Sequence, residues 1–228
     1  MRPYLPLALS ALLCACASLH GSSSGSTPPA DAQAVQLKSG PVHTDLIRDM
    51  IANGQYYAAL AHIEDERRNG GDTAELRLLE AEARRHLNQR AQAEALYRGL
   101  LAGPYAGPAY HGLGLLYVGT DLDTAIGDLR QAVRRMPTDV DFRNDLGYAL
   151  MQAGRYTEAM PELSTAAELA PDSRKCRNNL IILMMLMGNE AAVQKLAAGA
   201  GATADELQRL RAEAQQIRRQ QGGRIVAR

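Results

Sequence analysis

The side chains that could do chemistry are scattered along this 228-residue chain and form no catalytic motif. No two of the five histidines are four residues apart, the spacing that puts two metal ligands on one face of a helix. Glu80 and Glu82 are offset by two positions, so on a helix their carboxylates point apart. Gly112 and Gly114 are followed by Tyr117, where a dinucleotide-binding loop needs a third glycine. We therefore expect no catalytic, metal-binding or cofactor-binding site and no small-molecule substrate.

Charge and cysteine content exclude further classes of protein. The 25 Lys and Arg residues balance the 25 Asp and Glu residues, so the chain has no net charge with which to attract nucleic acid. Three cysteines are too few for a disulfide framework. Because 46% of the residues are apolar, the chain can bury the core of one or two folded domains. A folded protein without a nucleic-acid partner is the class that these features favour.

The first residues are typical of a secretory signal. Arg2 precedes an apolar run at residues 5–13, which is too short to span about 30 Å of hydrocarbon. The run ends in Leu13-Cys14-Ala15-Cys16, which resembles a bacterial lipobox. That resemblance implies a lipoprotein signal peptide at residues 1–15 and a lipidated N-terminal Cys16. A secreted protein that lacks the lipid is the alternative.

The segment after the signal is predicted to be a tether. Residues 16–40 are rich in Ser, Gly, Pro and Ala and hold almost no large apolar side chain, so they cannot bury enough surface to fold. Acyl chains on Cys16 would anchor this tether, since each buried methylene contributes about 0.8 kcal/mol. Ala17 resembles the sorting residue of lipoproteins bound for the outer membrane. We therefore expect an outer-membrane, lipid-anchored protein that faces the periplasm.

A period of about 34 residues organises the rest of the chain. Residues 144–171 (NDLGYALMQAGRYTEAMPELSTAAELAP) place Leu, Gly, Ala and Pro at the positions of a tetratricopeptide repeat, and residues 110–137 repeat the pattern. The resemblance implies paired antiparallel helices. Small residues belong where two helices approach closely, and they stand at the matching positions of both units: Gly114, Ala125, Gly147 and Ala159.

Each unit also has an end signal and a start signal. Pro137 and Pro171 follow the second helices, because proline disfavours helix at the residue before it and cannot continue the hydrogen-bond ladder. Asp139 and Asp172 stand just beyond as candidate N-caps of the next first helices.

Weaker copies on both sides extend the pattern to about five helical pairs over residues 41–202. Thr203 and Glu206 form a capping-box pattern, which predicts a capping helix over residues 203–220 and a disordered tail over 221–228. The predicted fold is all-α: a tetratricopeptide-repeat (TPR) α-solenoid of about five helical hairpins plus a C-terminal capping helix.

Residues 181–187 (IILMMLM) are apolar on every face of a helix. Either the capping helix covers the additional face, or a groove is exposed whose methionines accept a partner segment. In TPR proteins the first helices line the concave surface. By that resemblance the candidate partner groove contains His111, Leu115, Asn144, Tyr148, Asn178, Ile182 and Met185.

Taken together, the lipobox, the helical array and the asparagine-rich unit at residues 177–180 resemble the TPR lipoproteins of pilus assembly, TadD-like, from tight-adherence (Tad/Flp) systems. The resemblance implies a scaffold that binds a protein partner, an outer-membrane secretin or a pilus component, and assists secretin localisation or assembly. Two alternatives stay open. One is a type IVa-like pilotin or an outer-membrane assembly factor, and the other is a regulator of a cell-wall enzyme.

Overall fold

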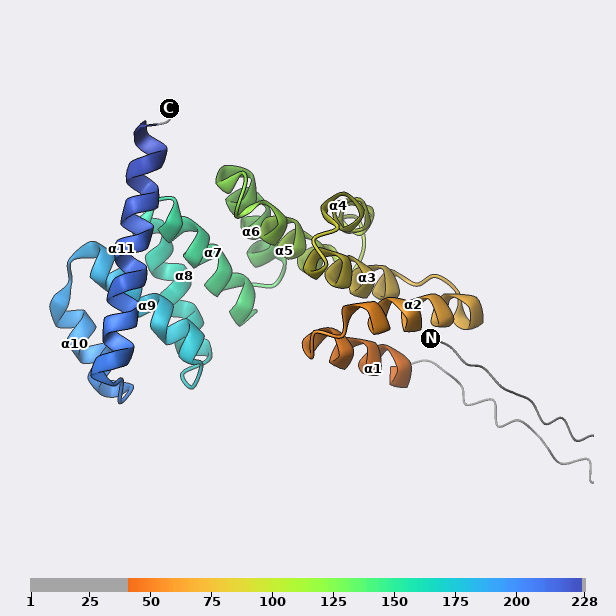
Figure 1. The fold of residues 1–228 in the computed structure, drawn as a ribbon, viewed down its shortest axis with the longest axis horizontal. Coiled ribbons are helices and arrows are strands. Elements are labelled where there is room, and N and C mark those ends of the chain that lie inside the picture. The colour runs from red at the N-terminus through yellow and green to blue at the C-terminus, as the bar shows by residue number, and fades with distance from the viewer. Residues whose placement is uncertain (1–40, 227–228) are drawn as a thin grey trace, which may run out of the picture. The chain divides into compact units, whose positions relative to one another are not determined.

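The computed structural model describes residues 41–226, and within that range it contains helices and no strand (Figure 1). The predicted signal peptide, Cys16 and tether lie outside the described residues. The helices are α1 (Pro41–Ala52), α2 (Tyr56–Gly70), α3 (Ala74–His86), α4 (Arg90–Gly99), α5 (Ala106–Tyr117), α6 (Leu122–Arg135), α7 (Val140–Gln152), α8 (Tyr156–Leu169), α9 (Arg174–Met187), α10 (Glu190–Gly199) and α11 (Ala204–Val226).

The first ten helices form five hairpins, each made of an odd-numbered first helix packed on the even-numbered second helix that follows it. First helices also contact one another, α1 with α3, α3 with α5 and α7 with α9, and α11 lies against α9 (Figure 1). The prediction of an all-α TPR solenoid with five hairpins and a capping helix is confirmed.

Glycine and alanine allow the helices of each hairpin to approach closely. An ideal β-carbon on Gly114 would lie 2.6 Å from Leu129 Cγ, and one on Gly147 would lie 2.6 Å from Leu163 Cγ. Real β-carbons do not come closer than about 3.0 Å to such atoms, so no larger residue fits without displacing its neighbour. Ala125 and Ala159 are fully buried at the equivalent contacts, as the repeat pattern predicts.

Two of the three N-cap residues predicted from the sequence are observed. Asp139 Oδ1 accepts a hydrogen bond of 3.0 Å from the Phe142 N–H at the start of α7, and Thr203 caps α11 in the same way. The prediction for Asp172 was wrong. Because α9 begins one residue later than expected, its N-cap is Ser173, whose Oγ accepts a hydrogen bond from the Cys176 N–H at 3.3 Å.

The apolar stretch of α9 is covered. Residues 181–184 and 186 are all buried, in one core cluster with Leu210, Ala214 and Ile217 of α11. Only Met187 at the end of the stretch is exposed, at 44%. Of the two alternatives for this segment, the capping helix is therefore the one that the structure supports.

Helix α11 is longer than the sequence indicated. A disordered tail was predicted from residue 221, but the helix continues to Val226, and residues 227–228 lie outside the described part. Gln221 explains the difference, because its side-chain amide donates hydrogen bonds to the carbonyl oxygens of Met151 at 2.8 Å and Gln152 at 3.3 Å. These carbonyls belong to the last turn of α7, and that of Met151 also accepts a hydrogen bond from the Gly154 N–H at 3.1 Å. The helices of the described region include none long and apolar enough to cross a membrane.

Candidate partner-binding groove

A hollow of about 490 Å³ opens on the side of the array formed by the first helices, and we call it the first-helix groove. Residues of α1, α3, α5 and α7 line it, together with Tyr97 of α4 and with Met136 and Asp139 from the connection between α6 and α7. The residues used below are Glu82, Arg85, Tyr97, His111, Leu115, Met136 and Phe142. The groove thus combines charged groups with apolar side chains, which suits a segment of another protein better than a single small molecule.

Tyr97 reaches the groove from behind the first helices. Its ring packs against Gly112, where an added β-carbon would lie 2.2 Å from Tyr97 Cζ, so only glycine lets α5 pass over the ring. The side chain is 0% exposed, and its hydroxyl has no hydrogen-bond partner in the described region. Burial and the nearby Glu82 carboxylate raise the pKa of this hydroxyl to about 12, so it remains protonated and can donate.

Glu82 and Arg85 lie beside this hydroxyl, one turn apart on α3. Burial raises the pKa of Glu82 above its ordinary value, and the positive charge of Arg85 partly offsets that rise. The Nε of Arg85 is buried and has no acceptor among residues 41–226. A carboxylate, a guanidinium and a hydroxyl are therefore neighbours in the lining of the groove.

His111 borders the groove and joins three hairpins. Its Nε2 lies 2.9 Å from Asp145 Oδ2 on α7, and Lys175 of α9 binds the other oxygen of that carboxylate at 2.9 Å. The imidazole also stacks on Phe142 with 4.5 Å between ring centroids. Burial alone would raise the pKa of Asp145, but the His111 hydrogen bond and the Lys175 charge outweigh burial and lower it to about 2. These contacts hold α5, α7 and α9 in register.

Of the seven predicted groove residues, His111 and Leu115 line the first-helix groove. Two others were predicted wrongly, because they are core residues with no free surface. Asn144 is 0% exposed; its amide donates to Asp145 Oδ1 at 3.0 Å and its oxygen accepts from Asn179 at 2.9 Å. Ile182 is 1% exposed and lies in the cluster that α11 covers.

The remaining three predicted residues are contacted by α11. The Tyr148 hydroxyl donates to Glu213 at 3.1 Å, and the Asn178 side chain donates to Glu206 at 3.3 Å. Arg218 donates to the main-chain oxygen of Met185 at 3.0 Å. Helix α11 therefore packs on the surface that the repeat pattern assigned to a partner at α9. At α7 it leaves a hollow of about 470 Å³, lined by Tyr148 and by residues of α11.

Sequence reasoning missed Glu82, Arg85 and Tyr97. Glu82 was considered only as a possible partner of Glu80, and the structure shows that the two carboxylates do face different hollows. One sequence feature could have pointed to Tyr97. Gly112 stands inside the helix that follows the one with Tyr97, and a glycine inside a helix often marks a place where a large side chain approaches closely.

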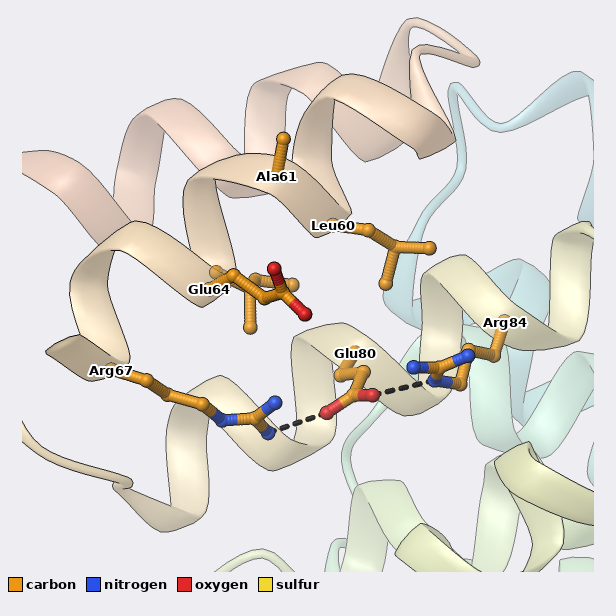
Figure 2. A pocket seen from close by; sticks show the side chains of 7 residues that line it. Leu60, Ala61, Glu64, Arg67, Glu80 and Arg84 are labelled. Carbon is orange, nitrogen blue, oxygen red and sulfur yellow. Dashed lines mark hydrogen bonds and ion pairs between the residues drawn. The ribbon is translucent and has the colours of Figure 1, made fainter.

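Another hollow, of about 250 Å³, lies between α2 and α3 and has a different character (Figure 2). Glu80 sits at its base between Arg67 of α2 and Arg84 of α3, and it binds both guanidinium groups (Figure 2). Arg67 also pairs with Asp72 at 2.9 Å. Because these charges already satisfy one another, we interpret the cluster as a clamp between two helices. In the described region no three His, Cys, Asp or Glu side chains are placed to hold a metal ion.

Comparison with known proteins agrees with this architecture. A tetratricopeptide-repeat family model matches residues 120–178, which run from α6 into the start of α9. The TPR repeat-containing protein PA4299 of Pseudomonas aeruginosa is 35% identical over 209 residues, which is 91% of this chain and 78% of that protein. The chain belongs to the tetratricopeptide-repeat family.

Solved structures show the same fold at lower identity. TTC0263, a thermophilic TPR protein of Thermus thermophilus, superposes with a TM-score of 0.60 at 22% identity, covering 77% of this chain and 97% of that one. MamA AMB-1 superposes with a TM-score of 0.53 at 22% identity, covering 72% of this chain and 91% of that one. At such identities the similarity defines the fold alone.

Proposed function

We propose that this chain is an outer-membrane lipoprotein scaffold that binds a protein partner through the first-helix groove. The partner that we propose is the secretin or a pilus component of a tight-adherence (Tad/Flp) pilus system, whose localisation or assembly the scaffold assists, as in TadD-like proteins. Membership of the TPR family supports the general role, a protein-interaction scaffold. The lipobox-like sequence at residues 13–16 and the tether that follows it support the membrane anchor.

One observation carries the partner-binding part of the proposal. The first-helix groove is open along α1, α3 and α5, whereas the equivalent face of α9 is covered by α11. Its lining combines charged side chains such as Glu82 and Arg85 with apolar side chains such as Leu115. A bound segment could pair with those charges while its apolar side chains pack on the wall.

The anchor is tested by cell fractionation. Wild-type protein should label with radioactive palmitate and sediment with outer membranes, whereas Cys16→Ser should lose the label and be released by osmotic shock. The matched control is Cys14→Ser, which leaves the acceptor thiol in place and should still label. A Cys16→Ser protein that stays in the membrane fraction would contradict the anchor.

The partner is tested by capture of solubilised secretin on the purified chain. Leu115→Asp places a charge on the groove wall and should abolish capture, because an unpaired carboxylate against an apolar segment is unfavourable. Tyr57→Asp is the control, since Tyr57 is 75% exposed on α2 and lies outside the groove. Equal capture by both variants would exclude the groove, and no capture by the wild-type chain would exclude the secretin.

A further inference from the structure

The hollow of about 470 Å³ between α7 and α11 has a charge pattern of its own, and we call it the α7–α11 hollow. Helix α11 packs on α9 and reaches α7 through hydrogen bonds of single side chains, from Tyr148 to Glu213 and from Gln221 to the carbonyl oxygen of Met151. The space beside these bonds is open. The polar side chains of α11 that line it therefore face solvent and not a neighbouring helix.

Two arginines lie toward the ends of the part of α11 that lines the hollow. Arg209 and Arg219 are both exposed, and neither forms an ion pair within the described region. Arg211 of the same helix differs, because it binds Glu190 at 3.2 Å and lies outside the hollow. Between the two free arginines lies the carboxylate of Glu213. The charges along the hollow are therefore positive, negative and positive.

The spacing of these charges fits an extended segment. Ten residues of α-helix separate Arg209 from Arg219, a rise of about 15 Å. An extended segment rises about 3.3 Å per residue, and residues an even number of positions apart point to the same face, so acidic residues four positions apart can reach both arginines. A carboxylate midway would lie against Glu213, which disfavours a segment whose acidic residues are adjacent.

Two glutamines on the same side of α11 suit the main chain of such a segment. Gln216 and Gln220 are one turn apart, both line the hollow and both are exposed. The rise between them is about 6 Å, close to the roughly 6.6 Å between alternate residues of an extended segment. The N–H and C=O groups of alternate residues point to the same side, and a carboxamide can pair with either group.

We propose that the α7–α11 hollow binds an extended acidic segment of a partner protein, with two carboxylates four residues apart. The carboxylates bind Arg209 and Arg219, and the main chain between them forms hydrogen bonds with the Gln216 and Gln220 side chains. This site goes beyond the proposed function and does not depend on it, because it shares no lining residue with the first-helix groove.

The test titrates blocked heptapeptides into the isotope-labelled full chain and follows the main-chain amides of α11 by NMR. Low salt is used, because exposed charges are then little screened. The peptides are Gly-Glu-Ser-Ser-Ser-Glu-Gly, its analogues with Gln or Lys in place of both Glu residues, and Gly-Ser-Glu-Glu-Ser-Ser-Gly, which has the same composition but adjacent glutamates.

The peptide with spaced glutamates should bind about threefold to tenfold more tightly than its Gln analogue, as expected for two exposed ion pairs. Its shifts should be largest at Gln216 and Gln220. Equal binding of the Gln analogue, equal binding of the peptide with adjacent glutamates, tighter binding of the Lys analogue, or no shift with any peptide would each overturn the proposal.

A double variant tests the two arginines. Arg209→Gln with Arg219→Gln removes both charges from exposed positions, so the fold should be unaffected while the preference for Glu over Gln disappears. Arg68→Gln with Arg211→Gln is the matched control, because it removes the same net charge from two exposed positions outside the hollow. The control should keep the preference, and a first double variant that also keeps it would refute the assignment.

A single variant tests the middle of the charge pattern. In Glu213→Gln the side-chain oxygen can still accept from Tyr148, so the link between α7 and α11 is retained. Without the central carboxylate, the peptide with adjacent glutamates should gain affinity relative to the spaced peptide. An unchanged ratio would show that Glu213 does not set the spacing and would contradict the proposal.

Anionic lipid is the competing ligand for two exposed arginines. The proposal is wrong if the Cys16→Ser chain sediments with phosphatidylglycerol vesicles only while both arginines are present and binds the two Glu peptides equally. Failure of the proposed function is distinguishable, because Leu115→Asp should leave peptide binding unchanged. A wild-type chain that binds the spaced peptide but captures no secretin would keep the α7–α11 hollow and exclude only the secretin.

Discussion

The ring of Tyr97 fills the space that a β-carbon at position 112 would need, because an ideal Cβ on Gly112 would lie 2.2 Å from Tyr97 Cζ. The two residues come from adjacent hairpins, so this contact sets how closely α5 can approach α4. It also places the Tyr97 hydroxyl at the floor of the groove. One glycine thus serves both the packing of the array and the shape of the candidate site.

We expect Gly112→Ala to destabilise the chain by about 1–3 kcal/mol, because an overpacked core forces side chains and backbone to shift. The control is Gly127→Ala, in the interior of α6, where an added β-carbon meets nothing within 4 Å. That change should stabilise the chain by up to about 1 kcal/mol through helix propensity. Urea unfolding followed by circular dichroism measures both, and equal midpoints for the two variants would contradict the close approach.

The clamp between α2 and α3 makes a second prediction. Glu80→Gln removes the carboxylate that pairs with Arg67 and Arg84 and leaves both guanidinium groups with one partner fewer. Because Glu80 is only 6% exposed, we expect a loss of about 1–3 kcal/mol in the free energy of unfolding.

Glu64→Gln is the matched control for this clamp, because Glu64 lines the same hollow but is exposed. Its effect should stay within about 0.5 kcal/mol. Thermal unfolding of the two variants distinguishes them, and a neutral Glu80→Gln would show that the buried ion pairs contribute no net stability.

Stability should depend on pH through Asp145. Its pKa is about 2 in the folded chain against an ordinary value of 3.8, so its charge stabilises the fold above about pH 4. That contribution should fall as the pH drops through 2, where the folded chain also binds the proton. At pH 7 we expect Asp145→Asn to lose about 2 kcal/mol and at pH 2 to lose almost nothing.

Asp141→Asn provides the comparison for that pH series. Asp141 also binds Lys175, at 3.2 Å, but its side chain is 70% exposed, so solvent screens the pair. Its removal should change the free energy of unfolding by less than about 0.5 kcal/mol at either pH. A loss for Asp145→Asn that persists unchanged to pH 2 would place the cause in packing and not in charge.

The covering of α9 by α11 gives a fourth prediction. Ile217→Ala removes a buried side chain from the shared core cluster and should cost about 2–4 kcal/mol. It should also increase binding of a hydrophobic dye, since the apolar face of α9 becomes accessible. Gln216→Ala, on the exposed side of α11, should leave both properties unchanged. Dye fluorescence at the wild-type level in Ile217→Ala would mean that α11 is not what covers this face.

The hairpins could be predicted because their signals are local or nearly periodic. Gly147 and Ala159 recur at the positions where two helices touch, and Asp139 caps the helix directly after it. These contacts lie within one hairpin or between neighbouring hairpins, so the pattern in a single sequence is enough to predict them. The number of hairpins and the capping helix followed from the same periodicity.

The candidate groove was harder to predict because its limits depend on residues far apart in the chain. Whether Tyr148 is free depends on Glu213, which is 65 positions away on α11. Asn144 fits the template for a concave residue, yet its amide oxygen accepts a hydrogen bond from Asn179 on α9 and the side chain is buried. The repeat pattern does not predict where the C-terminal helix packs. It therefore assigned residues of α9 to the groove, although α11 covers them.

Four of the hydrogen bonds that fasten the polar face of α11 end on peptide oxygens. Arg218 donates to the carbonyls of Met185 and Leu186, and Gln221 donates to those of Met151 and Gln152. A carbonyl oxygen is present whichever amino acid carries it. The end of the array should therefore stay closed while the sequences of α7 and α9 drift over evolution, provided that Arg218 and Gln221 are retained.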